Sequence, residues 1–157
     1  MHCGFRRGPL QNQWFEEAVC QTTSLFCLRA MALTWQTNPP YSHWVDYAPA
    51  LGTYAEDVIA NRTYKAELQS NGLAQFYRDH EAELRAAIDG RELTGAVTLA
   101  LLPFLEEAPS RWAAFRWLNA TARPENEPFT YYLTRWGQNT PEEHKATVQG
   151  VRQLLGL

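Results

Sequence analysis

The 157-residue sequence lacks an excess of basic residues. It contains 14 Lys and Arg residues against 17 Asp and Glu residues, which gives a formal net charge of −3. Proteins that bind nucleic acid without sequence preference normally carry a basic surface, because it displaces counterions from the phosphates. We therefore expect no nucleic-acid partner.

Long apolar runs are also missing. No stretch approaches the roughly 20 apolar residues that a helix needs to span a bilayer. Arg6 and Arg7 near the N-terminus have no apolar stretch behind them, unlike the charged end of a secretory signal peptide. We expect a soluble chain without a membrane partner, and the sequence leaves its compartment open.

Cysteines are few and not paired in the sequence. Cys3, Cys20 and Cys27 are an odd number with no CxxC spacing, which argues against a disulfide framework and a zinc ribbon. Cys20 and Cys27 are seven residues apart, and on one helix they would share a face. Their spacing predicts two small, buried, apolar side chains.

The sequence is rich in core-forming residues, with 45% hydrophobic and 13% aromatic side chains. This composition excludes intrinsic disorder. A chain of this length suits one domain, and no repeat, low-complexity tract or linker divides it. We expect a single domain over residues 1–157, with an irregular N-terminal segment over residues 1–12.

Helical periodicity recurs in each segment between the prolines and glycines. Residues 13–35 are apolar on more than one side, which predicts a buried, central helix. Residues 45–62 and 73–88 place apolar side chains at the spacing of amphipathic helices. Residues 93–107 are apolar enough for a short buried strand, but no partner strand is in view, so a helix is favoured.

Capping signals divide the C-terminal third into further helices. Ser110 offers an N-cap for one helix, and residues 129–136 predict another short one. Thr140 and Pro141 fit the cap and the first position of a final helix, with Glu143 completing a capping box. The predicted fold is all-α, a single compact domain of about six or seven helices around the buried N-terminal helix.

Two histidines are candidates for function. His80 and Glu81 begin like the zinc motif HExxH, but Leu84 stands where the second histidine belongs. We therefore expect His80 to be half-buried on its helix. His43 lies in an aromatic loop with Tyr41 and Trp44, which either lines a pocket or covers the edge of the core, and the second interpretation is favoured.

The segment Trp14-Phe15-Glu16-Glu17-Ala18 places two adjacent carboxylates at the start of a largely apolar helix. Acidic side chains near a helix N-terminus interact favourably with the helix dipole. That interaction accounts for the two acids but not for the aromatic pair ahead of them.

This segment resembles the second zinc-binding helix of the gluzincin metallopeptidases. In that family an aromatic pair is followed by a polar residue, the glutamate ligand and a small residue. The resemblance places the ligand at Glu17 and the small residue at Ala18. It also implies an upstream HExxH helix, which supplies two histidine ligands and the general base that activates a zinc-bound water. The helical tail over residues 129–148 is similar to tails of uncharacterised bacterial proteins of this kind.

The chain contains no HExxH motif. If the upstream half lies before Met1, His2 is the second histidine ligand of that motif. The predicted metal ligands are therefore Glu17 and His2 with zinc as the metal, and no catalytic residue is assigned.

The resemblance implies the C-terminal helical half of a gluzincin-like protein, catalytically silent or truncated, that contacts a protein or peptide. Two alternatives stay open. One is a zinc-dependent peptidase-like hydrolase whose site is completed by His2, His43 or His80, or by residues upstream. The other is a small helical module that binds an apolar ligand. The sequence does not indicate an oligomeric state.

Overall fold

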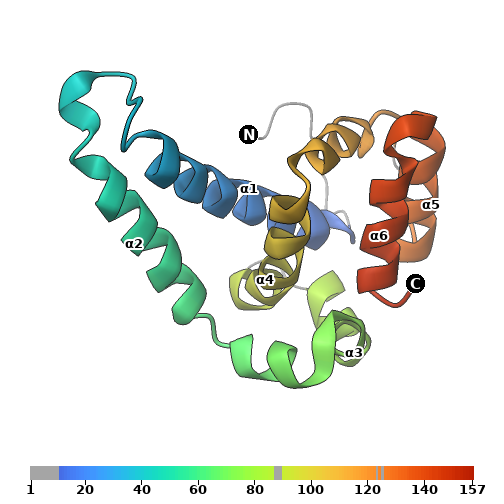
Figure 1. Ribbon diagram of the computed structural model, residues 1–157. Helices are drawn as coiled ribbons and strands as arrows, with labels where there is room; N and C mark the ends of the chain where they lie inside the picture. The colour runs from blue at the N-terminus through green and yellow to red at the C-terminus, as the bar shows by residue number, and fades with distance from the viewer. Residues whose placement is uncertain (1–10, 87–89, 123, 125) are drawn as a thin grey trace.

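The computed structural model describes residues 11–86, 90–122, 124 and 126–157. Their regular secondary structure is helical throughout, which confirms the all-α prediction, and none of their helices is long and apolar enough to cross a membrane. The predicted irregular segment 1–12 lies almost wholly outside the described residues. The elements, shown in Figure 1, are α1 (Gln13–Thr34), η1 (Ser42–Trp44), α2 (Tyr47–Ala60), α3 (Lys65–Ala86), α4 (Arg91–Glu107), η2 (Pro109–Trp117), α5 (Phe129–Asn139), η3 (Glu142–His144) and α6 (Lys145–Leu154), where η marks a 3₁₀-helix.

The core forms where the first half of α1 meets α3, α4, α5 and α6. Phe15 of α1 is fully buried and contacts the rings of Phe129 and Trp136. The buried residues of α1 end at Leu25, and Leu33 near its C-terminus is 71% exposed. The predicted burial of this helix therefore applies to its first half. The second half leaves the core and pairs with α2 in a hairpin (Figure 1).

The apolar segment after residue 90 is helical, as expected, and not a strand. Inside α4 the hydroxyl of Thr98 lies 3.0 Å from the carbonyl oxygen of Thr94 and 3.1 Å from that of Ala18 on α1. A side-chain hydrogen bond to the preceding turn satisfies a threonine that would otherwise favour a strand. The second contact links α4 to α1 inside the core.

Helix α3 is longer than the predicted range 73–88 because a short helical segment precedes it. The two segments meet at Gly72, whose φ of 74° lies in the left-handed region. Glycine adopts this conformation without the steric cost that a Cβ atom brings. The glycine therefore permits a sharp kink between residues 65–71 and 73–86.

Two capping predictions are wrong. Ser110 caps no helix, because the 3₁₀-helix η2 already begins at Pro109. Thr140 does not cap the last helix either, since its hydroxyl donates to the carbonyl oxygen of Trp136 at 2.7 Å and so closes α5. The final helix α6 begins at Lys145, after the turn of η3.

Candidate functional site

The structure describes one of the two predicted metal ligands. Glu17 is half-buried in the first turns of α1, and His2 lies outside the described residues. Within residues 11–86, 90–122, 124 and 126–157, no group of three or more His, Cys, Asp and Glu side chains could hold a metal ion. This part of the chain therefore supplies no complete zinc site, and the pairing of Glu17 with His2 stays a prediction.

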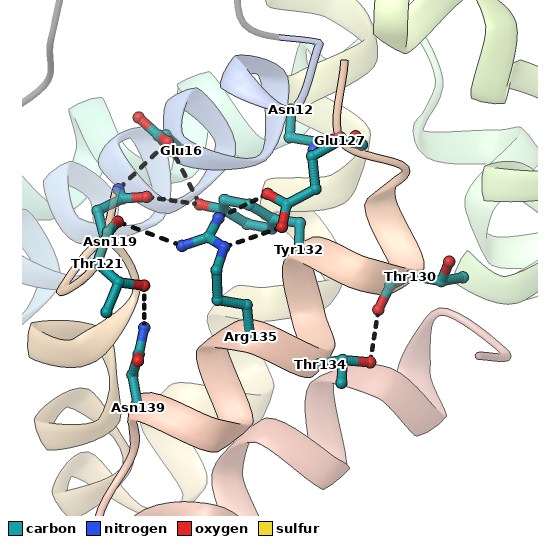
Figure 2. A network of polar contacts seen from close by, with 10 residues as sticks. All are labelled: Asn12, Glu16, Asn119, Thr121, Glu127, Thr130, Tyr132, Thr134, Arg135 and Asn139. Atoms are coloured by element: carbon teal, nitrogen blue, oxygen red, sulfur yellow. Dashed lines mark hydrogen bonds and ion pairs between the residues drawn. The ribbon is translucent and has the colours of Figure 1, made fainter. Parts of the chain in front are cut away.

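The neighbouring carboxylate, Glu16, is the buried one, with 4% of its surface exposed. Figure 2 shows its carboxylate directed toward the C-terminal part of the chain. The amide of Asn119 donates to Glu16 Oε1 at 3.2 Å, and the hydroxyl of Tyr132 lies 3.3 Å from the same oxygen. A buried carboxylate needs such donors to offset its desolvation. These contacts join the first turn of α1 to α5.

An ion pair lies beside this network. Arg135 of α5 donates to both carboxylate oxygens of Glu127, at 2.9 and 2.6 Å, and its guanidinium lies 5.3 Å from the ring centroid of Tyr132 (Figure 2). The amide of Asn12, just before α1, donates to the carbonyl oxygen of Glu127 at 2.8 Å. These groups join the start of α1 to the loop before α5, and that loop to α5 itself.

His80 is also engaged within the fold and is half-buried, as predicted. Its Nε2 lies 2.9 Å from Glu67 Oε1, and its Nδ1 lies 3.5 Å from Glu83 Oε2. Burial lowers the pKa of the imidazole, but the hydrogen bond to Glu67 and the nearby carboxylate of Glu83 outweigh it, so that the pKa is raised. The rings of Tyr64 and Phe76 pack against it. His80 therefore links the two segments of α3 across the kink.

The prediction that both cysteines are buried is wrong. Cys27 is exposed, because it lies on the part of α1 that has left the core, and Cys20 is half-buried. Burial and the neighbouring Glu17 carboxylate raise the pKa of the Cys20 thiol. A raised pKa keeps the thiol protonated near neutral pH, which lowers its reactivity.

The aromatic loop does not cover the core. Tyr41 and His43 are exposed, and η1 lies at the end of the α1–α2 hairpin, on the opposite side of the molecule from α5 and α6 (Figure 1). The favoured interpretation of His43, with Tyr41 and Trp44 at the core edge, is therefore wrong. It fails because α1 carries this loop out of the core.

At this end of the hairpin the aromatic rings contact one another. Trp44 is central, with its ring centroid 5.3 Å from that of Trp35, 4.9 Å from Tyr41 and 6.5 Å from Tyr47. Tyr54 follows Tyr47 by two helical turns on α2, which places both on one face of that helix. We name this surface the aromatic tip, and it comprises Trp35, Tyr41, His43, Trp44, Tyr47 and Tyr54.

The exposed large hydrophobic side chains are concentrated in and beside the aromatic tip. The large hydrophobic side chains that are exposed in the described part of the chain are seven, and five of them lie between residues 33 and 54. Within the tip, Tyr41, Tyr47 and Tyr54 are 58%, 56% and 61% exposed. Single exposed apolar residues are common on protein surfaces, but a cluster of them marks an interaction site.

Charge is almost absent from the same region. Residues 30–55 contain one charged side chain, Asp46, together with His43. Helix α2 packs against α1 and buries only Ala48 and Ala55 of its fourteen residues. A helix with so few polar groups is normally covered on more than one side. The sequence analysis missed this surface; the uncharged run 30–55 is the signal that could have indicated it, although it does not reveal that the rings are exposed.

Searches of protein-family models, of curated protein sequences and of solved structures find no match to this chain. Its function is therefore inferred from the residues and geometry described above.

Proposed function

We propose that this chain is a helical contact domain that binds a protein or peptide through the aromatic tip. The observation that carries the proposal is the position of the exposed apolar side chains. Five of the seven exposed in the described residues gather between residues 33 and 54, at the end of a hairpin that is remote from the core.

The residue types support a contact role. Tyrosine and tryptophan provide a large apolar surface and a polar group, and they are enriched among the residues that dominate binding energies. They also lose little conformational entropy on binding, because their side chains have two rotatable bonds. At the tip the rings of Trp35 and Trp44 already pack together, so that part of the surface is ordered before a partner arrives.

The absence of charge narrows the class of partner. An acidic or basic partner is selected by complementary charge. Because residues 30–55 carry only Asp46 and His43, the surface suits an uncharged, apolar region of a protein or peptide.

Site-specific photo-crosslinking in the cells that produce the protein tests this role. A photoreactive phenylalanine analogue replaces Tyr54 at the tip or, as a matched control, Tyr131, which is 68% exposed on α5. Position 54 is expected to form a crosslink to a protein, either another protein or a second copy, and position 131 is not. Equal crosslinking at both positions, or none at position 54, would contradict the proposal.

The gluzincin resemblance supplies a second candidate, a zinc-binding role for Glu17. The supporting observation is that buried neighbours on both sides, Glu16 and Ala18, fix the half-buried Glu17 on the first turns of α1. The described residues do not complete a site, so His2 or residues outside this chain would have to contribute ligands.

Zinc titration by calorimetry tests this candidate directly. One zinc ion bound per chain, lost in Glu17→Gln and retained in the exposed control Glu142→Gln, is the expected result. The absence of zinc binding to the 157-residue chain, or equal binding by both variants, would remove Glu17 and His2 as ligands within this chain.

A further inference from the structure

We propose that the partner of the aromatic tip is a second copy of this chain, joined through a two-fold contact between the α2 helices. This inference rests on the proposed contact role of the tip. It assigns the occupant of that surface, which the contact role alone leaves open.

The exposed face of α2 has the pattern of a helix-pairing surface. Tyr47, Ala50 and Tyr54 are all exposed and stand at positions i, i+3 and i+7, on one face of the helix. The small side chain of Ala50 between the two tyrosines allows another helix to approach closely. The face ends at the charged pair Glu56 and Asp57.

This face is complementary to itself. A two-fold contact brings the same patch of both copies together, so that residue i of one copy meets residue j of the other and the reverse. With the axis near Ala50 and the helices antiparallel, Tyr47 of each copy meets Tyr54 of the other. No charge lies between Tyr47 and Ala55, so the centre of the pairing is uncharged, and the acidic residues Asp46 and Asp57 lie at its ends.

The exposed apolar area of the tip is close to the apolar area that a stable interface buries on each partner. Aromatic side chains have roughly 150–250 Å² of surface each, so the 56–61% exposure of Tyr41, Tyr47 and Tyr54 amounts to about 350 Å². Val45, which is 38% exposed, and the exposed Ala50 lie in the same region and add to this area. A standard interface buries about 800 Å² per partner, of which little more than half is apolar. The tip therefore supplies most of the apolar area that a stable pair of copies needs.

Sedimentation velocity of the purified chain tests the inference. Over a range from about 1 μM to about 200 μM, the mass is expected to lie above 18.0 kDa and to reach twice that value at the highest concentrations. A mass that stays at 18.0 kDa over the whole range would overturn the inference.

Opposite charges at the proposed axis provide a sharper test. Ala50→Arg and Ala50→Glu each place two like charges at the axis, and each is expected to weaken self-association about tenfold or more. An equal mixture of the two variants is expected to associate again, because Arg of one copy then faces Glu of the other. Arg and Glu both favour helices, so α2 stays folded, which circular dichroism verifies.

The matched control is the same pair of changes at Tyr131, away from the tip. Tyr131→Arg and Tyr131→Glu are expected to associate like the unchanged chain. Equal effects at positions 50 and 131, or no recovery in the mixture of position-50 variants, would contradict a two-fold contact at Ala50.

The outcome separates this inference from the contact role on which it rests. If the purified chain stays monomeric while position 54 crosslinks to a different protein, the contact role stands and the second copy is not the partner. If position 54 forms no crosslink and the chain stays monomeric, both proposals fail.

Discussion

Glu127 and Arg135 form an ion pair that is almost entirely removed from solvent, since their side chains are 8% and 14% exposed. Such a pair has a high desolvation cost, which the two hydrogen bonds between the groups offset. The pair sits where the loop before α5 meets the first residues of α1, through the contact of Asn12 with Glu127. The pair therefore fixes the loop before α5 to that helix, while the backbone of Glu127 contacts Asn12.

We predict that Glu127→Gln lowers the free energy of unfolding by about 3–5 kcal/mol, because it leaves Arg135 charged and buried without its partner. The control is Glu142→Gln, which removes the partner of Lys145 from a pair whose glutamate side chain is 86% exposed. An exposed pair of this kind contributes at most about 1 kcal/mol. Urea denaturation measures both variants, and equal losses would contradict the structural role of the buried pair.

The contacts of His80 predict that the stability of the protein depends on pH. Its pKa is raised in the folded protein, because the hydrogen bond to Glu67 and the nearby carboxylate of Glu83 outweigh the effect of burial. Because the pKa is higher in the folded protein, the contacts of charged His80 stabilise the fold fully at pH values below the ordinary pKa of histidine. This contribution is lost as the pH rises through the raised value.

We therefore expect Glu67→Gln to lower the free energy of unfolding more at about pH 6 than at about pH 9, since histidine normally titrates near 6.5. The exposed Glu143→Gln serves as control and should show no such difference. Denaturant unfolding at the two pH values provides the measurement. A loss in Glu67→Gln that is the same at both would show that the contact does not depend on the charge of His80.

At the scale of the elements, the kink in α3 depends on a single backbone conformation. Gly72 has a φ of 74°, and a Cβ atom added there would meet no atom within 4 Å. Any cost of substitution is therefore a cost of the backbone and not of packing. His80 of the second segment and Glu67 of the first meet across this kink.

Gly72→Ala is expected to destabilise the protein by about 1–3 kcal/mol, because its φ of 74° and ψ of 166° lie in a region that is essentially restricted to glycine. Gly137→Ala in α5 is the matched control, because the added Cβ atom would lie 3.7 Å from Val148 in ordinary contact. Alanine favours the helix there, so stability should stay unchanged or rise by up to about 1 kcal/mol. Thermal unfolding compares the two, and a neutral Gly72→Ala would argue against a fixed kink.

The elements also show how far the sequence alone predicts the fold. Periodicity predicted the bounds of α1, α2 and α4 to within a few residues, because the spacing of apolar side chains is a local property of the sequence. It could not tell which of the adjacent Glu16 and Glu17 is buried. That choice depends on Asn119 and Tyr132, which are 103 and 116 residues away in the sequence.

The misplaced caps have the same origin. Thr140 and Pro141 are a good local signal for a helix start, but the hydroxyl of Thr140 already bonds to the carbonyl oxygen of Trp136. The same group can close one helix or open the next, and local sequence does not decide between them. For the aromatic loop, the sequence showed which aromatic residues it contains but not whether they are exposed. Their exposure depends on how far α1 extends beyond the core.

At the scale of the whole molecule, the described residues form a core and a hairpin that extends from it. The core joins the first half of α1 to α3, α4, α5 and α6, and it holds the buried ion pair and the Glu16 network. The hairpin of α1 and α2 extends from this core and carries the aromatic tip (Figure 1). On this account the tip residues serve binding and contribute little to folding.

Unfolding of Tyr54→Ser beside Tyr77→Ser, at low protein concentration, tests this division most directly. The two tyrosines are 61% and 3% exposed. Tyr54→Ser is expected to change the free energy of unfolding by no more than about 0.5 kcal/mol, whereas Tyr77→Ser should lower it by about 3 kcal/mol or more. A loss in Tyr54→Ser comparable to that in Tyr77→Ser would show that the aromatic tip is part of the folded core and would contradict its role as a contact surface.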